Sequence, residues 1–183
     1  MNLPNILTFV RIGLIPVFVL AFYLPFSGAH MLTAAIFALA AFTDVLDGYL
    51  ARRLGQVSAL GTFLDPVADK LMVAVALVLL VQADPTPWLA IPAAVIIGRE
   101  ITISALREWM AEIGKRTSVA VSVIGKFKTI AQMLALLFLL YREPLAGLPI
   151  YSAGLVLLYL AAGLTLWSMV VYLRTAWHSL RAG

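Results

Sequence analysis

Four aspartates stand close together in the stretch DVLDGYLARRLGQVSALGTFLDPVADK, residues 44–70. Asp44 and Asp47 are three residues apart, and Asp65 and Asp69 are four residues apart. On a helix either spacing places both carboxylates on one face, because each residue turns the helix by about 100°. The loop between the two pairs is short, which favours antiparallel neighbouring helices. The stretch therefore predicts two helix ends whose carboxylates face each other.

Such a cluster needs positive charge nearby, because carboxylates repel one another and each one in a bilayer core costs about 2.5 to 3.5 kcal/mol. Arg52 and Lys70 could supply two of the charges. Divalent cations would supply more, and an oxygen-only ligand set without His or Cys favours Mg²⁺ or Mn²⁺. Two such ions, about 3.5 to 4 Å apart, are a known arrangement for phosphoryl chemistry. The alternatives are a proton or cation pathway and simple ion pairs between helix ends.

The elements that carry these acids are membrane helices. Only 12% of the 183 residues are charged, and the mean hydropathy is +1.01, whereas a soluble domain averages about 25% charged residues. We expect one all-α domain, residues 1–183, folded as a bundle of six transmembrane helices. Each apolar segment has about 20 residues, enough to span hydrocarbon. The six segments are residues 7–25, 31–51, 59–82, 88–110, 121–141 and 151–175.

The basic residues give the bundle a direction. With six spans and the amino terminus inside, 12 of the 13 Lys and Arg residues fall on the inner side and only Arg142 falls on the outer side. By the positive-inside rule, both termini and the four aspartates face the cytoplasm. The start of the chain lacks the basic region of a signal peptide. We expect a retained interfacial lead-in there, on which Asn5, Thr8 and Arg11 form a polar face.

Small residues accompany the acids on both helices. Gly48 and Ala51 fall within the arc of the first pair, with Arg52 at its edge, and Gly61 precedes Asp65 by one turn. The pattern D-x-x-D-G-x-x-A-R, eight residues, G-x-x-x-D-x-x-x-D resembles, with no departure, the signature of the CDP-alcohol phosphatidyltransferases. Three further stretches, NLPNILTFVRIGLIP, IIGREITISALREW and GKRTSVAVSVIGKFKT, look like the bacterial branch that makes phosphatidylglycerophosphate. The resemblance thus covers most of the chain.

The resemblance implies a reaction and its cofactors. The donor would be CDP-diacylglycerol and the acceptor sn-glycerol 3-phosphate, giving phosphatidylglycerophosphate and CMP. Two ions of Mg²⁺ or Mn²⁺ would be bound by Asp44, Asp47, Asp65 and Asp69, and Asp69 would also act as the general base. Sequence alone does not separate these two roles of Asp69. A homodimer in the bacterial inner membrane, among membrane lipids, is also implied.

The donor would lie against the signature. Small residues leave room for cytidine and diphosphate, and a guanidinium binds phosphate in two-pronged fashion. The expected CDP-diacylglycerol-binding set is Thr43, Gly48, Ala51, Arg52, Gly61 and Thr62. Helix packing is an equal alternative for the two threonines, and anchoring at the inner membrane surface is the alternative for Arg52.

The acceptor carries its own phosphate, so a second basic cluster is expected. The candidates are Arg99, Arg107, Lys126 and Lys128. Arg99 lies beside Glu100 within a predicted span, where an ion pair that supports the bundle is the alternative. Lys115 and Arg116 are expected to contact anionic lipid headgroups instead.

Two other functions stay open from the residues. The same chemistry would serve another acceptor, such as serine, inositol phosphate or phosphatidylglycerol. A cation transporter would also use intramembrane carboxylates, but it needs acids near the midplane with access from both sides, whereas these acids cluster at one end. The basic residues are spread along one membrane surface, so we expect no nucleic-acid partner.

Overall fold

The computed structural model describes residues 3–54, 59–114, 123–145 and 147–181. In these ranges the chain is all-α, with helices α1 (Leu3–Phe22), α2 (Ala29–Leu54), α3 (Ala59–Ala83), α4 (Pro87–Glu112), α5 (Val123–Tyr141) and α6 (Ile150–Arg181). Each predicted apolar segment overlaps one of these helices, although the first, 7–25, runs past the end of α1 at Phe22, and residues 121–122 of the fifth lie outside the described residues. The main difference is at the start, where α1 begins at Leu3 and the expected lead-in is part of the first helix.

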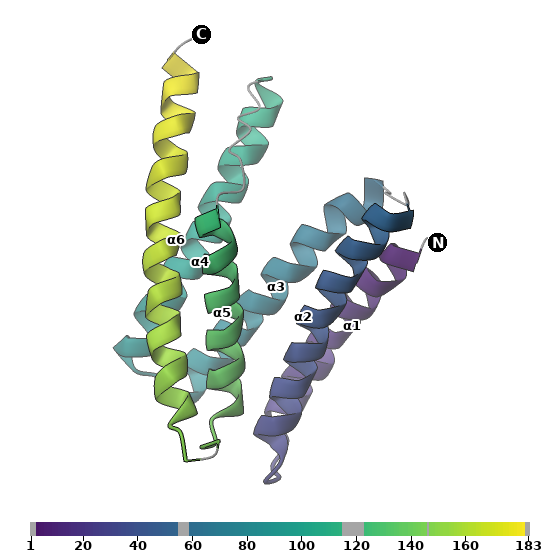
Figure 1. Cartoon of the computed structure of the whole chain (residues 1–183), viewed down its shortest axis with the longest axis vertical. Helices are drawn as coiled ribbons and strands as arrows, with labels where there is room; N and C mark the ends of the chain where they lie inside the picture. The colour runs from purple at the N-terminus through teal and green to yellow at the C-terminus, as the bar shows by residue number, and fades with distance from the viewer. Residues whose placement is uncertain (1–2, 55–58, 115–122, 146, 182–183) are drawn as a thin grey trace.

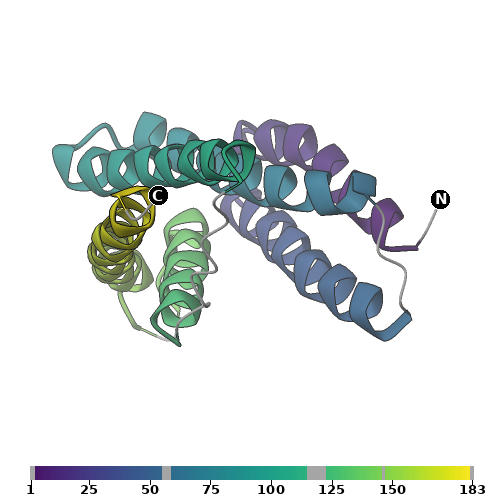
Figure 2. The same cartoon turned by 90° about the horizontal axis from the view of Figure 1, so that it is seen from above.

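Two groups of helices make up the molecule, and α3 crosses between them (Figure 1). α1 packs along α2, α5 packs along α6, and α4 packs against α6. α3 contacts α1, α4 and α5, and α2 also contacts α5. Seen from above, α6 lies against α4 and α5, on the side away from α1 and α2 (Figure 2).

An apolar core of side chains from all six helices holds the groups together. Its fully buried members include Phe18 of α1, Leu80 of α3 and Leu136 of α5. The rings of Phe18 and Phe37 lie 6.1 Å apart and join α1 to α2. A smaller cluster between α4 and α6 contains Ile103, Met110 and Tyr172. These apolar contacts hold the two groups of helices together, so polar residues can lie at the helix ends.

The outer surface of the bundle is apolar. Large side chains such as Leu20, Val45 and Trp88 are 69%, 69% and 71% exposed. Apolar surface on this scale marks a surface that faces something other than water. Among the described residues, four stretches are long and apolar enough to cross a membrane, by length and composition. They are Asn5–Phe22, Ala29–Gly48, Pro87–Glu112 and Ile150–Trp177. The protein is therefore an integral membrane protein.

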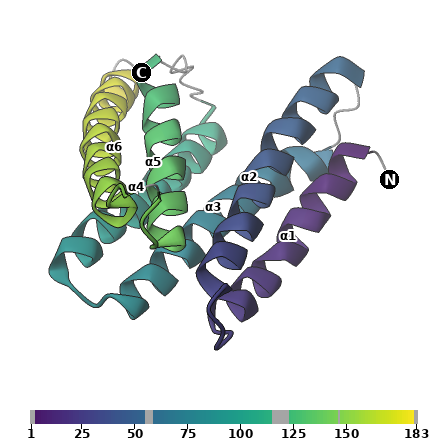
Figure 3. The ribbon, with the colours of Figure 1, turned by 60° about the horizontal axis from the view of Figure 1, so that its bottom comes forward.

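The two signature helices are arranged differently from the simplest prediction. α2 and α3 run in opposite directions, as expected, but they contact each other only slightly. α1 packs against both of them instead. The amino-terminal half of α1 therefore lies beside the end of α2 and the start of α3, which meet at the same end of the molecule (Figures 1 and 3).

Candidate active site

Three of the four aspartates contact the side chain of Arg11. This arginine lies in the third turn of α1, and its side chain is 1% exposed. One guanidinium nitrogen, Nη1, lies 3.1 Å from Oδ1 of Asp44 and 2.7 Å from Oδ1 of Asp69. The other, Nη2, is paired with Oδ2 of Asp47. One planar fork thus connects α1 to both signature helices, as the five N–H donors of arginine permit.

The fourth aspartate is also bound from α1. Thr8, one turn before Arg11 and buried, donates a hydrogen bond to Oδ1 of Asp65. The sequence predicts only a polar face for Asn5, Thr8 and Arg11. A stronger signal was available, because Arg11 is a charged residue inside a membrane-length apolar segment, and such residues face the bundle interior and have partners. The partners themselves are 33 to 58 residues away and could not be identified from spacing.

The aspartates differ in their access to the surroundings. Asp47 is buried, at 3% exposure of its side chain, whereas Asp44 and Asp69 are 36% and 40% exposed. The two accessible carboxylates line a cavity of about 240 Å³. Pro66, Lys70 and Val73 of α3, Glu100 of α4, and Lys128, Thr129, Gln132 and Met133 of α5 complete its wall. A small ligand in this cavity would contact both accessible acids.

The donor chemistry of the cluster fits divalent cations. Three carboxylates pair with one guanidinium and the fourth is bound by Thr8, which leaves a formal charge of −3 when all four are ionised. The ligand atoms are all carboxylate oxygens, the kind that Mg²⁺ and Mn²⁺ prefer. In the described part of the chain, no three acidic or histidine side chains already converge as a metal cage. The carboxylates point instead at Arg11, which lies between them.

A second charged cluster lies across the cavity. Oε1 of Glu100 is 2.7 Å from Nη1 of Arg99 and 3.0 Å from Nζ of Lys128. Nη2 of Arg99 also donates to the hydroxyl of Ser168 on α6, at 3.3 Å. Two of the residues expected to bind the acceptor phosphate thus come together, through an acidic residue between them. The ion pair of Arg99 with Glu100 is the contact that the alternative interpretation of Arg99 anticipated.

Of the other two acceptor candidates, Arg107 makes its described ring contact on α6. Arg107 is exposed, and its guanidinium carbon lies 5.5 Å from the centre of the Tyr172 ring. The side chain of Lys126 lies outside the described part of the structure, as do Lys115 and Arg116 entirely. Lys128 is therefore the expected acceptor residue with the clearest position, since it is 6% exposed and lines the cavity.

The expected donor site is described only in part. Thr43 is buried and donates to the carbonyl oxygen of Ala40, at 2.8 Å, which is the packing role named as its alternative. A Cβ added at Gly48 would meet no described atom within 4 Å, so there is open space beside it. Gly61 is buried in α3. The side chains of Ala51, Arg52 and Thr62 lie outside the description.

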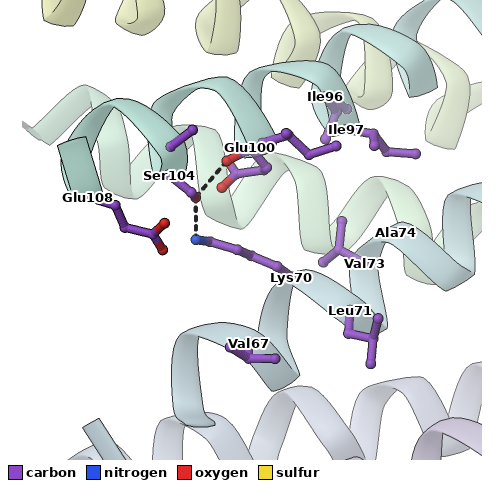
Figure 4. A pocket seen from close by; sticks show the side chains of 12 residues that line it. Val67, Lys70, Leu71, Val73, Ala74, Ile96, Ile97, Glu100, Ser104 and Glu108 are labelled. Carbon is purple, nitrogen blue, oxygen red and sulfur yellow. Dashed lines mark hydrogen bonds between the residues drawn. The ribbon is translucent and has the colours of Figure 1, made fainter. Parts of the chain in front are cut away.

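An apolar groove between α3 and α4 continues from the cavity (Figure 4). Its volume is about 460 Å³, and Leu71, Ala74 and Ile97 are among its lining residues. At its polar end Lys70 donates to the hydroxyl of Ser104, which in turn donates to the backbone carbonyl of Glu100, at 2.6 Å. Lys70, Val73 and Glu100 line both the groove and the cavity. The two spaces therefore meet at these residues.

Comparison with known proteins agrees with the signature. Residues 1–170 match the family described as CDP-alcohol phosphatidyltransferase. A protein of Pectobacterium atrosepticum is 59% identical over 179 residues, which cover 98% of this chain and 97% of the relative. Relatives from Pseudomonas fluorescens and Sodalis glossinidius are 57% and 58% identical over 182 residues, with 99% and 98% of this chain and 93% and 97% of theirs covered. All three are called CDP-diacylglycerol–glycerol-3-phosphate 3-phosphatidyltransferase.

Proposed function

The chain belongs to the CDP-alcohol phosphatidyltransferase family, and we propose that it transfers the phosphatidyl group of CDP-diacylglycerol to sn-glycerol 3-phosphate. The products are phosphatidylglycerophosphate and CMP, so the protein makes the precursor of phosphatidylglycerol. Near-complete coverage by relatives of 57% to 59% identity, all named for this reaction, supports the choice of acceptor.

The observation that carries the proposal is that α1 binds all four signature aspartates, three through Arg11 and the fourth through Thr8. The reaction forms a bond between the acceptor hydroxyl oxygen and the phosphatidyl phosphorus, and it breaks the diphosphate bond to CMP. The hydroxyl must lose its proton in the process, and a nearby carboxylate is a suitable acceptor for it. We assign this role to Asp69, which is half exposed on the cavity wall while Asp47 is buried.

The other acids would hold the cofactor. Asp44, Asp47 and Asp65, together with Asp69, form the proposed ligand set for two ions of Mg²⁺ or Mn²⁺. Bound ions supply neutralisation of the diphosphate oxygens and stabilise the charge that develops on departing CMP. The −3 formal charge around Arg11 supports this assignment, because a cluster with that charge attracts cations and repels a diphosphate in their absence.

We assign binding of the acceptor phosphate to the second charged cluster, which consists of Arg99, Glu100 and Lys128. Lys128 and Arg99 together bring two positive charges against the single negative charge of Glu100. Lys128 and the two accessible aspartates line the same cavity of about 240 Å³. This arrangement supports a binding mode in which glycerol phosphate spans the cavity, with its phosphate near Lys128 and its hydroxyl near Asp69. Arg107 and Lys126 remain proposed as further contributors to the positive field on this side.

The donor's acyl chains are assigned to the groove between α3 and α4. Its apolar walls suit hydrocarbon, and its polar end meets the cavity at Lys70 and Glu100. A lipid in the groove would therefore have its tails at membrane depth and its headgroup at the aspartates. Gly48, Ala51, Arg52, Gly61 and the two threonines remain the proposed contacts for cytidine and diphosphate.

Placement in the membrane completes the proposal. All six helices would cross the bacterial inner membrane, with both termini and the aspartates on the cytoplasmic side, where CMP and glycerol phosphate are found. The bias of basic residues supports this orientation. We keep the homodimer as part of the proposal.

The test is CMP release by the detergent-purified protein. CDP-diacylglycerol and Mg²⁺ are supplied, and glycerol 3-phosphate, serine, inositol phosphate or phosphatidylglycerol is added one at a time, each with an EDTA control. We expect release with glycerol 3-phosphate only, and none in EDTA. Release with a different acceptor would overturn the assigned substrate, and undiminished release in EDTA would overturn the metal dependence.

A further inference from the structure

Arg11 is the one residue at the centre of the cluster that the proposed reaction does not use. It is a charged side chain in a membrane-length apolar stretch, and it is 1% exposed. Its Nη atoms are taken up by three carboxylates, while its Nε has no hydrogen-bond partner among the described residues. The carboxylates stabilise the positive charge of Arg11 in this buried position, and Arg11 in turn offsets the repulsion among the carboxylates.

The oxygens that Arg11 binds are the ones a divalent cation would need. Nη1 contacts Oδ1 of Asp44 and Oδ1 of Asp69, and these two carboxylates are the members of the cluster open to the cavity. A cation arriving through the cavity meets two carboxylates that already share a guanidinium. Two positive charges at one set of oxygens repel each other, so occupation by either weakens the other.

We propose that Arg11 is a built-in counter-ion, which holds the acidic cluster together without metal and competes with divalent cations for Asp44 and Asp69. Arg11 is in this sense a positioning residue. It allows the metal-free protein to fold with four carboxylates side by side, and it lowers the affinity of the site for metal. The inference rests on the proposed metal dependence and adds a residue of α1 to the site.

Two properties of the protein follow from competition. Replacing Arg11 with a neutral residue leaves the carboxylates with no counter-charge, so the metal-free protein becomes less stable. The same replacement removes the competitor, so divalent cations bind more tightly. A residue that only packs α1 against α2 and α3 would lower stability without raising metal affinity, and this difference separates the two roles.

The experiment is a titration of the full-length protein in detergent with Mn²⁺, followed by the electron paramagnetic resonance signal of the free ion. The variant is Arg11→Gln, and melting temperatures are recorded in EDTA and in saturating Mn²⁺. We expect the Mn²⁺ dissociation constant to fall about tenfold or more, because one positive charge within 3 to 4 Å is lost. The melting temperature should fall in EDTA and recover in Mn²⁺.

The matched control is Arg174→Gln, the same substitution on an exposed residue in the carboxyl-terminal part of α6. It should leave both the Mn²⁺ affinity and the melting temperature in EDTA unchanged. Arg11→Lys keeps a positive charge without the fork, and it should fold even if Arg11→Gln does not. Its Mn²⁺ affinity should lie between those of the wild type and Arg11→Gln, because the positive charge stays but the compact ammonium lacks the planar fork that reaches carboxylates of both signature helices.

Unchanged or weaker Mn²⁺ binding in the Arg11 variants would overturn the proposal, and so would the absence of saturable binding to any of the proteins. CMP release by the wild type in EDTA tests the metal dependence separately. If release persisted in EDTA, the proposed cofactor would be wrong, while the Mn²⁺ titration would still decide whether Arg11 competes for the carboxylates.

Discussion

At the scale of single residues, the four aspartates of one motif differ in their surroundings. Asp47 is buried against Arg11, and Asp65 accepts a hydrogen bond from Thr8. Asp69 lies on the cavity wall and directly precedes Lys70, another wall residue. Identical side chains therefore have different surroundings. Exposure and contacts distinguish them, which spacing along a helix does not.

Asp69→Asn tests the assignment of the base. An amide keeps the shape of the side chain but cannot take a proton, so turnover should fall by at least about 100-fold, the usual contribution of a general base. Binding of CDP-diacylglycerol should be largely preserved, because three of the four acids remain. Turnover and lipid binding are measured on the same purified protein, and turnover near the wild-type rate would remove Asp69 as base.

Lys128 and Arg107 test the acceptor site as a pair. Lys128 lines the cavity, whereas Arg107 lies over the Tyr172 ring. We expect Lys128→Met to raise the KM for glycerol 3-phosphate about tenfold or more, the effect of one lost charge-assisted hydrogen bond. Arg107→Ala should raise it less, and both should affect the acceptor more than the donor. Equal losses for the two substrates in steady-state kinetics would contradict an acceptor role.

At the scale of helices, much of the arrangement follows from the sequence, and some of it does not. The apolar segments and the acids at the end of α2 and the start of α3 were predictable, because length, hydropathy and spacing are local properties. The insertion of α1 beside both signature helices was not, because it depends on contacts such as Arg11 with Asp69, 58 residues apart. Of the two ion pairs made by Glu100, only the one with Arg99 was anticipated, as the alternative for Arg99, and the one with Lys128 was not.

The groove between α3 and α4 gives a prediction about how these two helices bind the acyl chains of the donor. Ala105 is an exposed groove residue, and Ala105→Phe would fill the space with a ring. We expect a higher KM for CDP-diacylglycerol with long acyl chains and little change for a short-chain analogue, which needs less of the groove. The control is Ala94→Phe, an exposed position on the same helix that does not line the groove. Equal KM changes for the two donors would contradict the assigned lipid path.

At the scale of the whole molecule, orientation in the membrane decides which substrates reach the site. The chain contains no cysteine, so single cysteines report position without background. Ser27→Cys lies in the connection from α1 to α2, and Glu112→Cys lies at the end of α4, and both positions are exposed. In intact spheroplasts a membrane-impermeant maleimide should label Ser27→Cys only. Glu112→Cys should become labelled after the membrane is opened, and the reverse pattern would contradict a cytoplasmic active site.

The aspartate cluster is proposed to carry out the phosphatidyl transfer, and the most direct measurement is formation of phosphatidylglycerophosphate by purified protein. Mass spectrometry follows this product from CDP-diacylglycerol, glycerol 3-phosphate and Mg²⁺ for the wild type and for Asp44→Asn, Asp47→Asn and Asp65→Asn. We predict one product molecule per CMP for the wild type and a loss of about 100-fold or more in each folded variant. Product formation at wild-type rates by any of these variants, or none by the folded wild type, would contradict the account.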